Sequence, residues 1–279
     1  MKIEDVIDRS IVAIFRDPIL GKKLVLKGGS ALRLLENDRT RLSIDADFSV
    51  KKAITEERFF ERMEAALKKE FGSMGLDVID FLAIRRPSRI KKGFPEWWGG
   101  WLCQFKLLET TYRNLSKEDK RRRSIIPEGA SSSKIELEIS EHEYCGQKRR
   151  KQIKGVIVQG YSRELLILEK LRAICQQHIK YKFRTRKHRS RDFYDIYRLC
   201  SNMDDELLQE CKKRLAPVFN AKKVPLELLK ALWEKEFIEE QQQGFTQVVN
   251  TVRDNVYEFE VYLEHVRYLV LQIHPEVSK

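Results

Sequence analysis

Residues 27–32 read KGGSAL and residues 41–48 read RLSIDADF, and these two segments decide the fold. The apolar run 24–26 ends at the glycine pair, which predicts a strand that runs into a turn. Ser30 is a suitable N-cap for the helix that follows. The second segment predicts another strand over 41–50. We therefore expect two strands joined by a glycine turn and a short helix.

The second strand carries two acids, Asp45 and Asp47, in alternate positions. Alternate residues of a strand point to the same face, so both carboxylates would aim at one spot and favour a cation between them. Mg²⁺ or Mn²⁺ suits such a site, because a hard divalent ion binds one or two carboxylates together with substrate phosphates. Gly28, Gly29 and Ser30 offer backbone amides and a hydroxyl to phosphate at a helix start. The combination indicates metal-assisted transfer of a nucleotide from an NTP.

A third acid is expected on the metal, because in-line displacement also needs a group that helps the attacking hydroxyl. Residues 134–140 read KIELEIS and place two acids on one face of a predicted strand. Glu138 is our choice and Glu136 the alternative. Acids on a solvated strand face, opposite an apolar face, would give the same alternation.

Composition narrows the class of protein. The chain has 279 residues, of which 42% are hydrophobic and 34% charged, as in a globular protein. No apolar run approaches the roughly 20 residues of a membrane span, and the first residues are charged, so we expect a cytoplasmic protein with no membrane partner. The five cysteines form no CxxC pair, which argues against a zinc knuckle. The net charge of +12 favours a polyanionic partner.

The order of predicted elements indicates an α/β (α+β) fold. Helices are expected over 2–16, 55–71 and 163–178, and strands over 76–84, 101–108, 134–140 and 154–159. Nearly everything after residue 191 has helical periodicity. We therefore expect a catalytic domain over 1–160, built on a mixed sheet with flanking helices, and a helical domain over 161–279.

Three basic clusters, residues 117–123, 147–154 and 179–191, could contact nucleic-acid phosphates. Tyr181 and Phe183 lie within the third cluster and could stack on an unpaired base. A solvated basic loop is the alternative for each cluster. The residues expected to contact nucleic acid are Lys180, Lys182, Arg184, Arg186, Lys187 and Arg189.

Two further positions are candidates for function. Lys170, on the predicted helix 163–178, could neutralise a triphosphate, although a lysine on a helix is more often solvated. Asp192 and Asp195 share one face near the start of the next helix. Acids are favoured there by the helix dipole as well, and Asp195 could simply pair with a neighbouring arginine.

Taken together, residues 27–32, 41–48, 169–173 and 191–197 resemble the AbiEii/MenT-type nucleotidyltransferase toxins of the DNA polymerase β-like superfamily. The resemblance implies a minimal nucleotidyltransferase fold with a helical C-terminal domain that contributes to the active-site cleft. It also implies Mg²⁺-dependent transfer of an NMP from an NTP, and usually a cognate antitoxin. Some members of the family modify the 3′ end of tRNA.

Carried onto this sequence, the resemblance implies that Gly29 and Ser30 hold the triphosphate and that Asp45 and Asp47 bind metal. It implies that Lys170 contacts nucleotide phosphates and that Asp192 is an essential acid. Within the same motifs, Gly28, Arg41 and Ser43 are also expected at the nucleotide.

We therefore expect an enzyme that transfers an NMP to RNA, at the 3′ end of tRNA, as the toxin of a toxin–antitoxin or abortive-infection system. One alternative is an NMP transferase that acts on protein or small-molecule hydroxyls. The other is a catalytically inactive module that binds nucleic acid or an antitoxin. The intact pair of acids argues against an inactive module.

Overall fold

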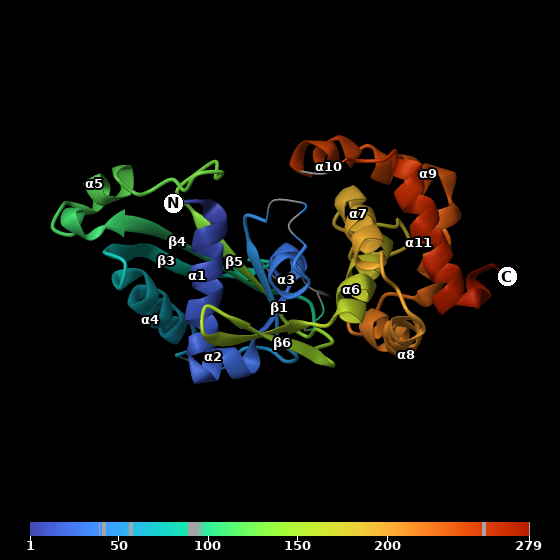
Figure 1. Cartoon of the computed structure of the whole chain (residues 1–279), viewed down its shortest axis with the longest axis horizontal. Helices are drawn as coiled ribbons and strands as arrows, with labels where there is room; N and C mark the ends of the chain where they lie inside the picture. Colours follow the sequence, from blue (N-terminus) through green and yellow to red (C-terminus); the bar gives the residue numbers. More distant parts are fainter. Residues whose placement is uncertain are drawn as a thin grey trace. The chain divides into compact units, whose positions relative to one another are not determined.

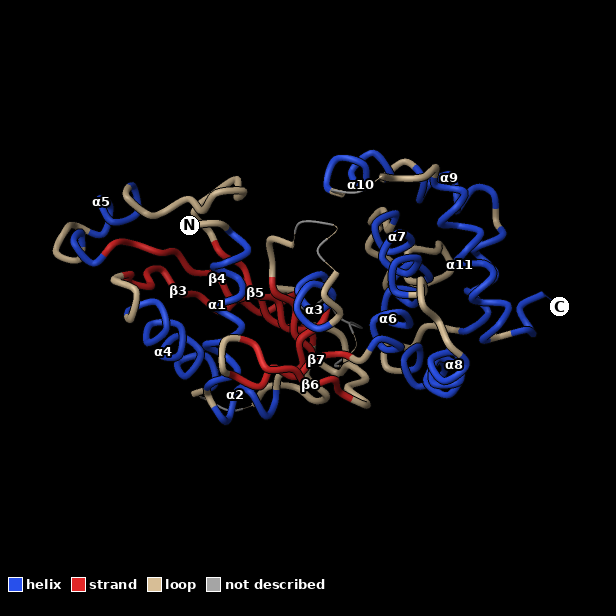
Figure 2. Tube along the Cα trace, in the orientation of Figure 1, coloured by secondary structure: helices blue, strands red, loops and turns tan. Residues whose placement is uncertain are grey.

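The computed structural model describes residues 1–38, 40, 43–55, 58–88, 95, 97–252 and 255–278. The chain divides into two compact units (Figure 1). The first contains Met1–Asp38 and Leu42–Tyr161, and the second is built mainly from Ser162–Lys279. Strands occur in the first unit, whereas the second is helical (Figure 2). The chain thus has the mixed α/β fold expected from its sequence.

The first unit is built on one mixed sheet with the strand order β3-β4-β5-β2-β1-β7-β6. Strand β2 lies at its centre, antiparallel to β1 and parallel to β5. Strand β1 is also parallel to β7, and the remaining neighbours are antiparallel. The bounds are β1 (Val25–Lys27), β2 (Ala46–Ser49), β3 (Leu76–Arg86), β4 (Gly100–Glu109), β5 (Ile135–Ser140), β6 (Lys148–Ile153) and β7 (Val156–Tyr161).

Helices α1 (Ile3–Arg16) and α4 (Phe59–Gly72) supply the apolar packing of one sheet face. The ring of Phe48, in β2, lies 6.2 Å from that of Phe15, and Phe105, in β4, lies 5.9 Å from Phe71. Successive residues of a strand point to opposite faces, so the neighbours of Phe48 in β2 point away from these helices. Asp47 therefore lies outside this core. The first unit also contains α2 (Pro18–Lys23), α3 (Gly28–Leu35), α5 (Lys117–Arg122) and the 3₁₀ turn Thr110–Tyr112.

The second unit surrounds α6 (Arg163–Cys175), which is buried on nearly every side. Its buried residues include the apolar run 165–168 and also the charged residues Glu164, Lys170 and Arg172. Aromatic pairs join α7 to α11, with Phe193 5.1 Å from Phe259 and Tyr194 5.5 Å from Tyr262. The other elements are α7 (Ser190–Leu199), α8 (Asp205–Asn220), α9 (Lys235–Gln242), α10 (Phe245–Thr251), α11 (Phe259–Ile273) and the 3₁₀ segments Leu226–Trp233 and Pro275–Ser278.

Most predicted elements occur within a few residues of their expected bounds, but two local predictions are wrong and one strand was missed. Helix α3 begins at Gly28, with Lys27 at the N-cap position, so Ser30 is not the cap. The strand expected over 41–50 is only four residues long and starts after Asp45. Strand β6 was not predicted, because its sequence, KRRKQI, lacks apolar alternation. Lysine and arginine are typical of an edge strand, where they discourage pairing with another chain.

No helix in the described part of the chain is long and apolar enough to cross a membrane.

Candidate active site

The acids predicted on two separate strands lie beside one another in the sheet. Asp47 of β2 is in register with Glu138 of the parallel strand β5, and with Lys27 of the antiparallel strand β1. Directly opposed residues point to the same face, with Cβ atoms about 4.5–5.5 Å apart in an antiparallel pair. Lys27, Asp47 and Glu138 therefore form a charged row across three neighbouring strands, on the face opposite Phe48.

The register favours Glu138 over Glu136 as the third acid. Glu136 lies beyond the first residue of β2 that pairs with β5, and it is opposite Gln104 of β4 instead. The amide Nε2 of Gln104 donates a hydrogen bond to Glu136 Oε1. Glu138, in contrast, is exposed on the face that carries Asp47.

Gly28 brings the start of α3 against the Asp47 carboxylate. Its φ of +66° lies in the left-handed region, which favours glycine. A Cβ atom at this position would lie 2.1 Å from Asp47 Oδ2 and 2.9 Å from its Cγ. Both the backbone conformation and the close approach of the carboxylate therefore require glycine. The amides at the start of α3 remain the candidate phosphate contacts.

Ser30 connects α3 to the segment that precedes β2. Its hydroxyl donates to the backbone carbonyl of Asp45 at 2.7 Å and lies 3.3 Å from Ser43 Oγ. Ser30 is fully buried, and Ser43 is nearly so. The hydroxyl of Ser30 thus orders the chain at Asp45, and a contact with phosphate would require it to give up that carbonyl. Arg41, predicted at the nucleotide, lies outside the described residues.

The donors on this face suit a hard divalent ion. Carboxylate oxygens are the ligands that Mg²⁺ prefers, and one or two of them suffice when substrate phosphates and water complete the shell. Asp47 and Glu138 provide two neighbouring carboxylates, and Asp45 is exposed just before β2. No group of three or more His, Cys, Asp or Glu side chains among the described residues forms a ready-made metal cage. The residues therefore fit an ion that the substrate helps to hold.

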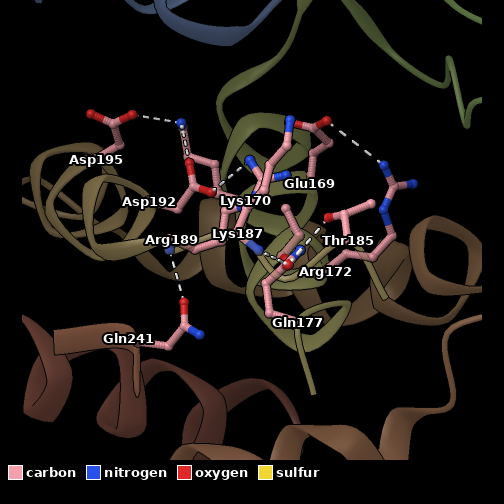
Figure 3. A network of polar contacts seen from close by, with 11 residues as sticks. Glu169, Lys170, Arg172, Gln177, Thr185, Lys187, Arg189, Asp192, Asp195 and Gln241 are labelled. Atoms are coloured by element: carbon pink, nitrogen blue, oxygen red, sulfur yellow. Dashed lines mark hydrogen bonds and ion pairs between the residues drawn. The ribbon is translucent and has the colours of Figure 1, made fainter. Parts of the chain in front are cut away.

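A second polar cluster lies within the helical unit (Figure 3). Lys170 of α6 is only 4% exposed, and its Nζ lies 2.6 Å from Asp195 Oδ2 and 3.1 Å from Asp192 Oδ1. Both acids come from α7, three residues apart, so they face α6 together. Arg189 Nη1 lies 3.5 Å from the other oxygen of Asp192. The alternative of a solvated Lys170 does not hold, because the side chain is buried between two carboxylates, whereas its predicted contact with nucleotide phosphates stays a prediction.

Asp195 had been given no functional role from the sequence, because it could simply pair with a neighbouring arginine. It is 2% exposed and holds the shorter contact to Lys170. A buried ammonium is tolerated when carboxylates compensate its charge, which makes Asp195 as necessary to Lys170 as Asp192 is. The feature of the sequence that could have identified Asp195 is the helix face that it shares with Asp192.

The basic segment 179–191 is partly held by its own unit. Arg184 pairs with Glu240, and the backbone amide of Arg189 donates to Gln241 Oε1 at 2.8 Å. The backbone amide of Lys187 donates to Gln177 Oε1 at 2.7 Å, as Figure 3 shows. These contacts fix the course of the segment. The lysine and arginine side chains of the segment that remain exposed are those of Lys180, Lys182, Arg186, Lys187 and Arg191.

Tyr181 does not offer a ring face to a base. It is 4% exposed, and its hydroxyl donates to the carbonyl of Lys222 at 2.7 Å. Its ring also packs edge to face against Phe183. The stacking role expected for Tyr181 is therefore wrong, because the residue belongs to the core of the helical unit.

A family model described as "Nucleotidyl transferase AbiEii toxin, Type IV TA system" matches residues 10–265. No curated protein sequence matches the chain significantly. Similar solved structures include JHP933 from Helicobacter pylori (17% identity, 99% of this chain and 92% of that one, TM-score 0.44).

Two further solved structures are similar to the chain. One is a putative nucleotidyltransferase from Helicobacter pylori, with 18% identity over 99% of this chain and 95% of that one, at a TM-score of 0.44. The other is an antigenic nucleotidyltransferase-like protein from Paracoccidioides brasiliensis, with 18% identity over 78% and 93% and a TM-score of 0.38. Because the family model spans most of its length, the chain belongs to the AbiEii family of nucleotidyltransferase toxins of type IV toxin–antitoxin systems.

Proposed function

We propose that the enzyme transfers an NMP from an NTP to an RNA, with the 3′ end of tRNA as acceptor, in a reaction that requires Mg²⁺ or Mn²⁺. The observation that carries this proposal is the register of Asp47 with Glu138, next to the glycine that opens α3. Carboxylates and helix-start amides thus occupy neighbouring positions in one unit. This is the pairing that a metal-bound triphosphate needs.

The residues divide the work of an in-line displacement. The acceptor hydroxyl attacks the α-phosphorus, the new P–O bond replaces the bond to the β-phosphate oxygen, and pyrophosphate leaves. Asp45, Asp47 and Glu138 would hold the divalent ion, which supplies charge stabilisation to the transferring and leaving groups. The backbone amides of Gly28 and Gly29 would donate hydrogen bonds to phosphate oxygens. Ser30 acts by ordering the carbonyl of Asp45.

Lys170 and Asp192 form a second functional cluster, to which we add Asp195. The contacts of the Lys170 ammonium with two carboxylates support an electrostatic role for the cluster as a unit. A phosphate contact by Lys170 would have to compete with these carboxylates. Binding of a fluorescent NTP to Lys170→Ala, compared with the wild type, tests whether the phosphate contact exists.

Charge supports RNA as the acceptor. The net charge is +12, and phosphate contacts by lysine and arginine give affinity without sequence specificity. In each of the two basic clusters of the first unit, an arginine forms an ion pair within that unit: Arg121 pairs with Asp80, and Arg149 pairs with Glu36. The exposed lysines of the segment 179–191 are therefore the better candidates for RNA contact. As a type IV toxin, the chain would be neutralised by a cognate antitoxin.

The decisive experiment incubates the protein with each α-³²P-NTP, total RNA and total protein, and then reads which fraction becomes labelled. We expect label in RNA, its loss in Asp45→Asn and Asp47→Asn, and its retention in Glu118→Gln, a matched change of an exposed acid on α5. Label in the protein fraction would favour the alternative that modifies protein hydroxyls. Mg²⁺-dependent NTP binding without labelling would favour an inactive binding module.

A further inference from the structure

Lys27 is a charged residue in an apolar setting. It belongs to β1, all of whose residues are buried, and it is only 8% exposed. An apolar side chain is usual at such a position, because taking an ammonium out of water is costly unless it is paired. Its Nζ lies 3.7 Å from Oε1 of Glu143, another buried residue. The pair needs an explanation beyond packing.

The position of Lys27 supplies that explanation. It is directly opposite Asp47, and both side chains point to the face that carries Glu138. Its backbone therefore lies one strand spacing from that of Asp47 and two strand spacings from that of Glu138. The backbone of Glu143 is held just past the last residue of β2, where its amide donates to the carbonyl of Val50 at 3.1 Å.

We propose that Lys27 and Glu143 set the net charge of the acid face, by which we mean the sheet face that carries Asp47 and Glu138. Lys27 weakens the affinity of this face for a free divalent cation and strengthens its affinity for a triphosphate. This inference rests on the proposed function. The three acids alone would favour a bare divalent ion over an anionic nucleotide. A buried lysine beside Asp47 opposes that preference, so the ion is favoured when it arrives with the nucleotide. Lys27 is thus a positioning residue, which acts through the effect of its charge on the binding of the ion and the nucleotide.

The sign of the effect separates this role from a structural one. Removing Lys27 leaves the face more negative, so binding of a divalent cation should tighten while binding of metal-free NTP weakens. Removing the charge of Glu143 should have the opposite effects. If the pair only stabilised the fold, either substitution would loosen the same strands. The binding of both ligands would then be weaker in both variants.

Binding of Mn²⁺ without nucleotide, followed by the EPR signal of the free ion, tests the inference independently of catalysis. A unit charge about 8 Å from a divalent ion in a water-like medium changes its affinity about fivefold. We expect Lys27→Met to bind Mn²⁺ about fivefold more tightly and Glu143→Gln to bind it more weakly. The matched control is Lys68→Met on α4, which removes the same charge from an exposed site.

Two further variants keep the result interpretable. Lys27→Met with Glu143→Gln removes both charges, restores the balance and should return Mn²⁺ affinity to the wild-type value. Asp47→Asn reports whether Mn²⁺ binds at the acid face at all. Unchanged or weaker binding in Lys27→Met, with binding still dependent on Asp47, would overturn the role of Lys27 alone. Binding independent of Asp47 would overturn both the inference and the metal site of the proposed function.

Discussion

Replacing Gly28 with alanine should lower activity far more than the accompanying loss of stability can explain. The new Cβ would lie 2.1 Å from Asp47 Oδ2, so this carboxylate oxygen must move by more than about 1 Å to reach ordinary van der Waals contact. Because the oxygen ends a flexible side chain, the movement costs little folding energy. A misplacement of about 1 Å at a reacting centre is enough to lower a rate about 100-fold. The left-handed backbone adds a stability cost of about 1–2 kcal/mol.

Gly155→Ala is the matched control. Gly155 also has a positive φ, +79°, but a Cβ atom there would meet no other atom within 4 Å. Both variants should therefore lose a similar 1–2 kcal/mol in the free energy of unfolding, measured by denaturant titration, because both force alanine into the left-handed region. Only Gly28→Ala should lose activity.

The assay is the initial rate of transfer of labelled NMP to RNA, measured for both variants at saturating Mg²⁺. We expect kcat/KM of Gly28→Ala to fall about 100-fold relative to Gly155→Ala. If the two variants keep rates within a factor of three, the placement of Asp47 against Gly28 does not control the chemistry, and the reasoning from the close contact is refuted.

Three other outcomes follow from contacts in the two units. Ser30→Ala should lower the transfer rate and cost about 1 kcal/mol of stability, because the hydrogen bond to the carbonyl before β2 is lost; thermal unfolding and labelling measure both. Lys170→Met should cost about 3–5 kcal/mol in the unfolding of the helical unit, since it removes a buried ammonium group from between two carboxylates, and adding Asp195→Asn should recover part of that loss. The hydrogen bond from Arg113 holds the pKa of Asp77 below its usual value, so the pair stabilises the fold above about pH 4 and this contribution disappears as the pH falls through the lowered pKa. Arg113→Leu should remove that part of the acid dependence in a thermal-unfolding series from pH 6 to 3, and an unchanged series would contradict it.

Local sequence accounts for the parts of the site that depend on near neighbours in the chain. The glycine turn and the short helix follow from backbone sterics. The expected alternation of Asp45 and Asp47 along one strand was wrong, because Asp45 lies before the first residue of β2. Long periodic helices such as α1 and α4 were predictable from the spacing of their apolar residues. The polar strand β6 was not, because its pairing with β7 decides its conformation and no apolar pattern marks it.

The segments that carry the chemistry could be identified from the amino-acid sequence alone: the glycine pair, Asp45 with Asp47, and a choice between two acids on a later strand. The tertiary structure was needed to show that Glu138 and Lys27 flank Asp47, since strand register joins residues 20 and 91 positions apart along the chain. It also decided that Lys170 is buried between two aspartates. Side-chain burial depends on which helices pack together, and this is not encoded in the periodicity of either helix alone.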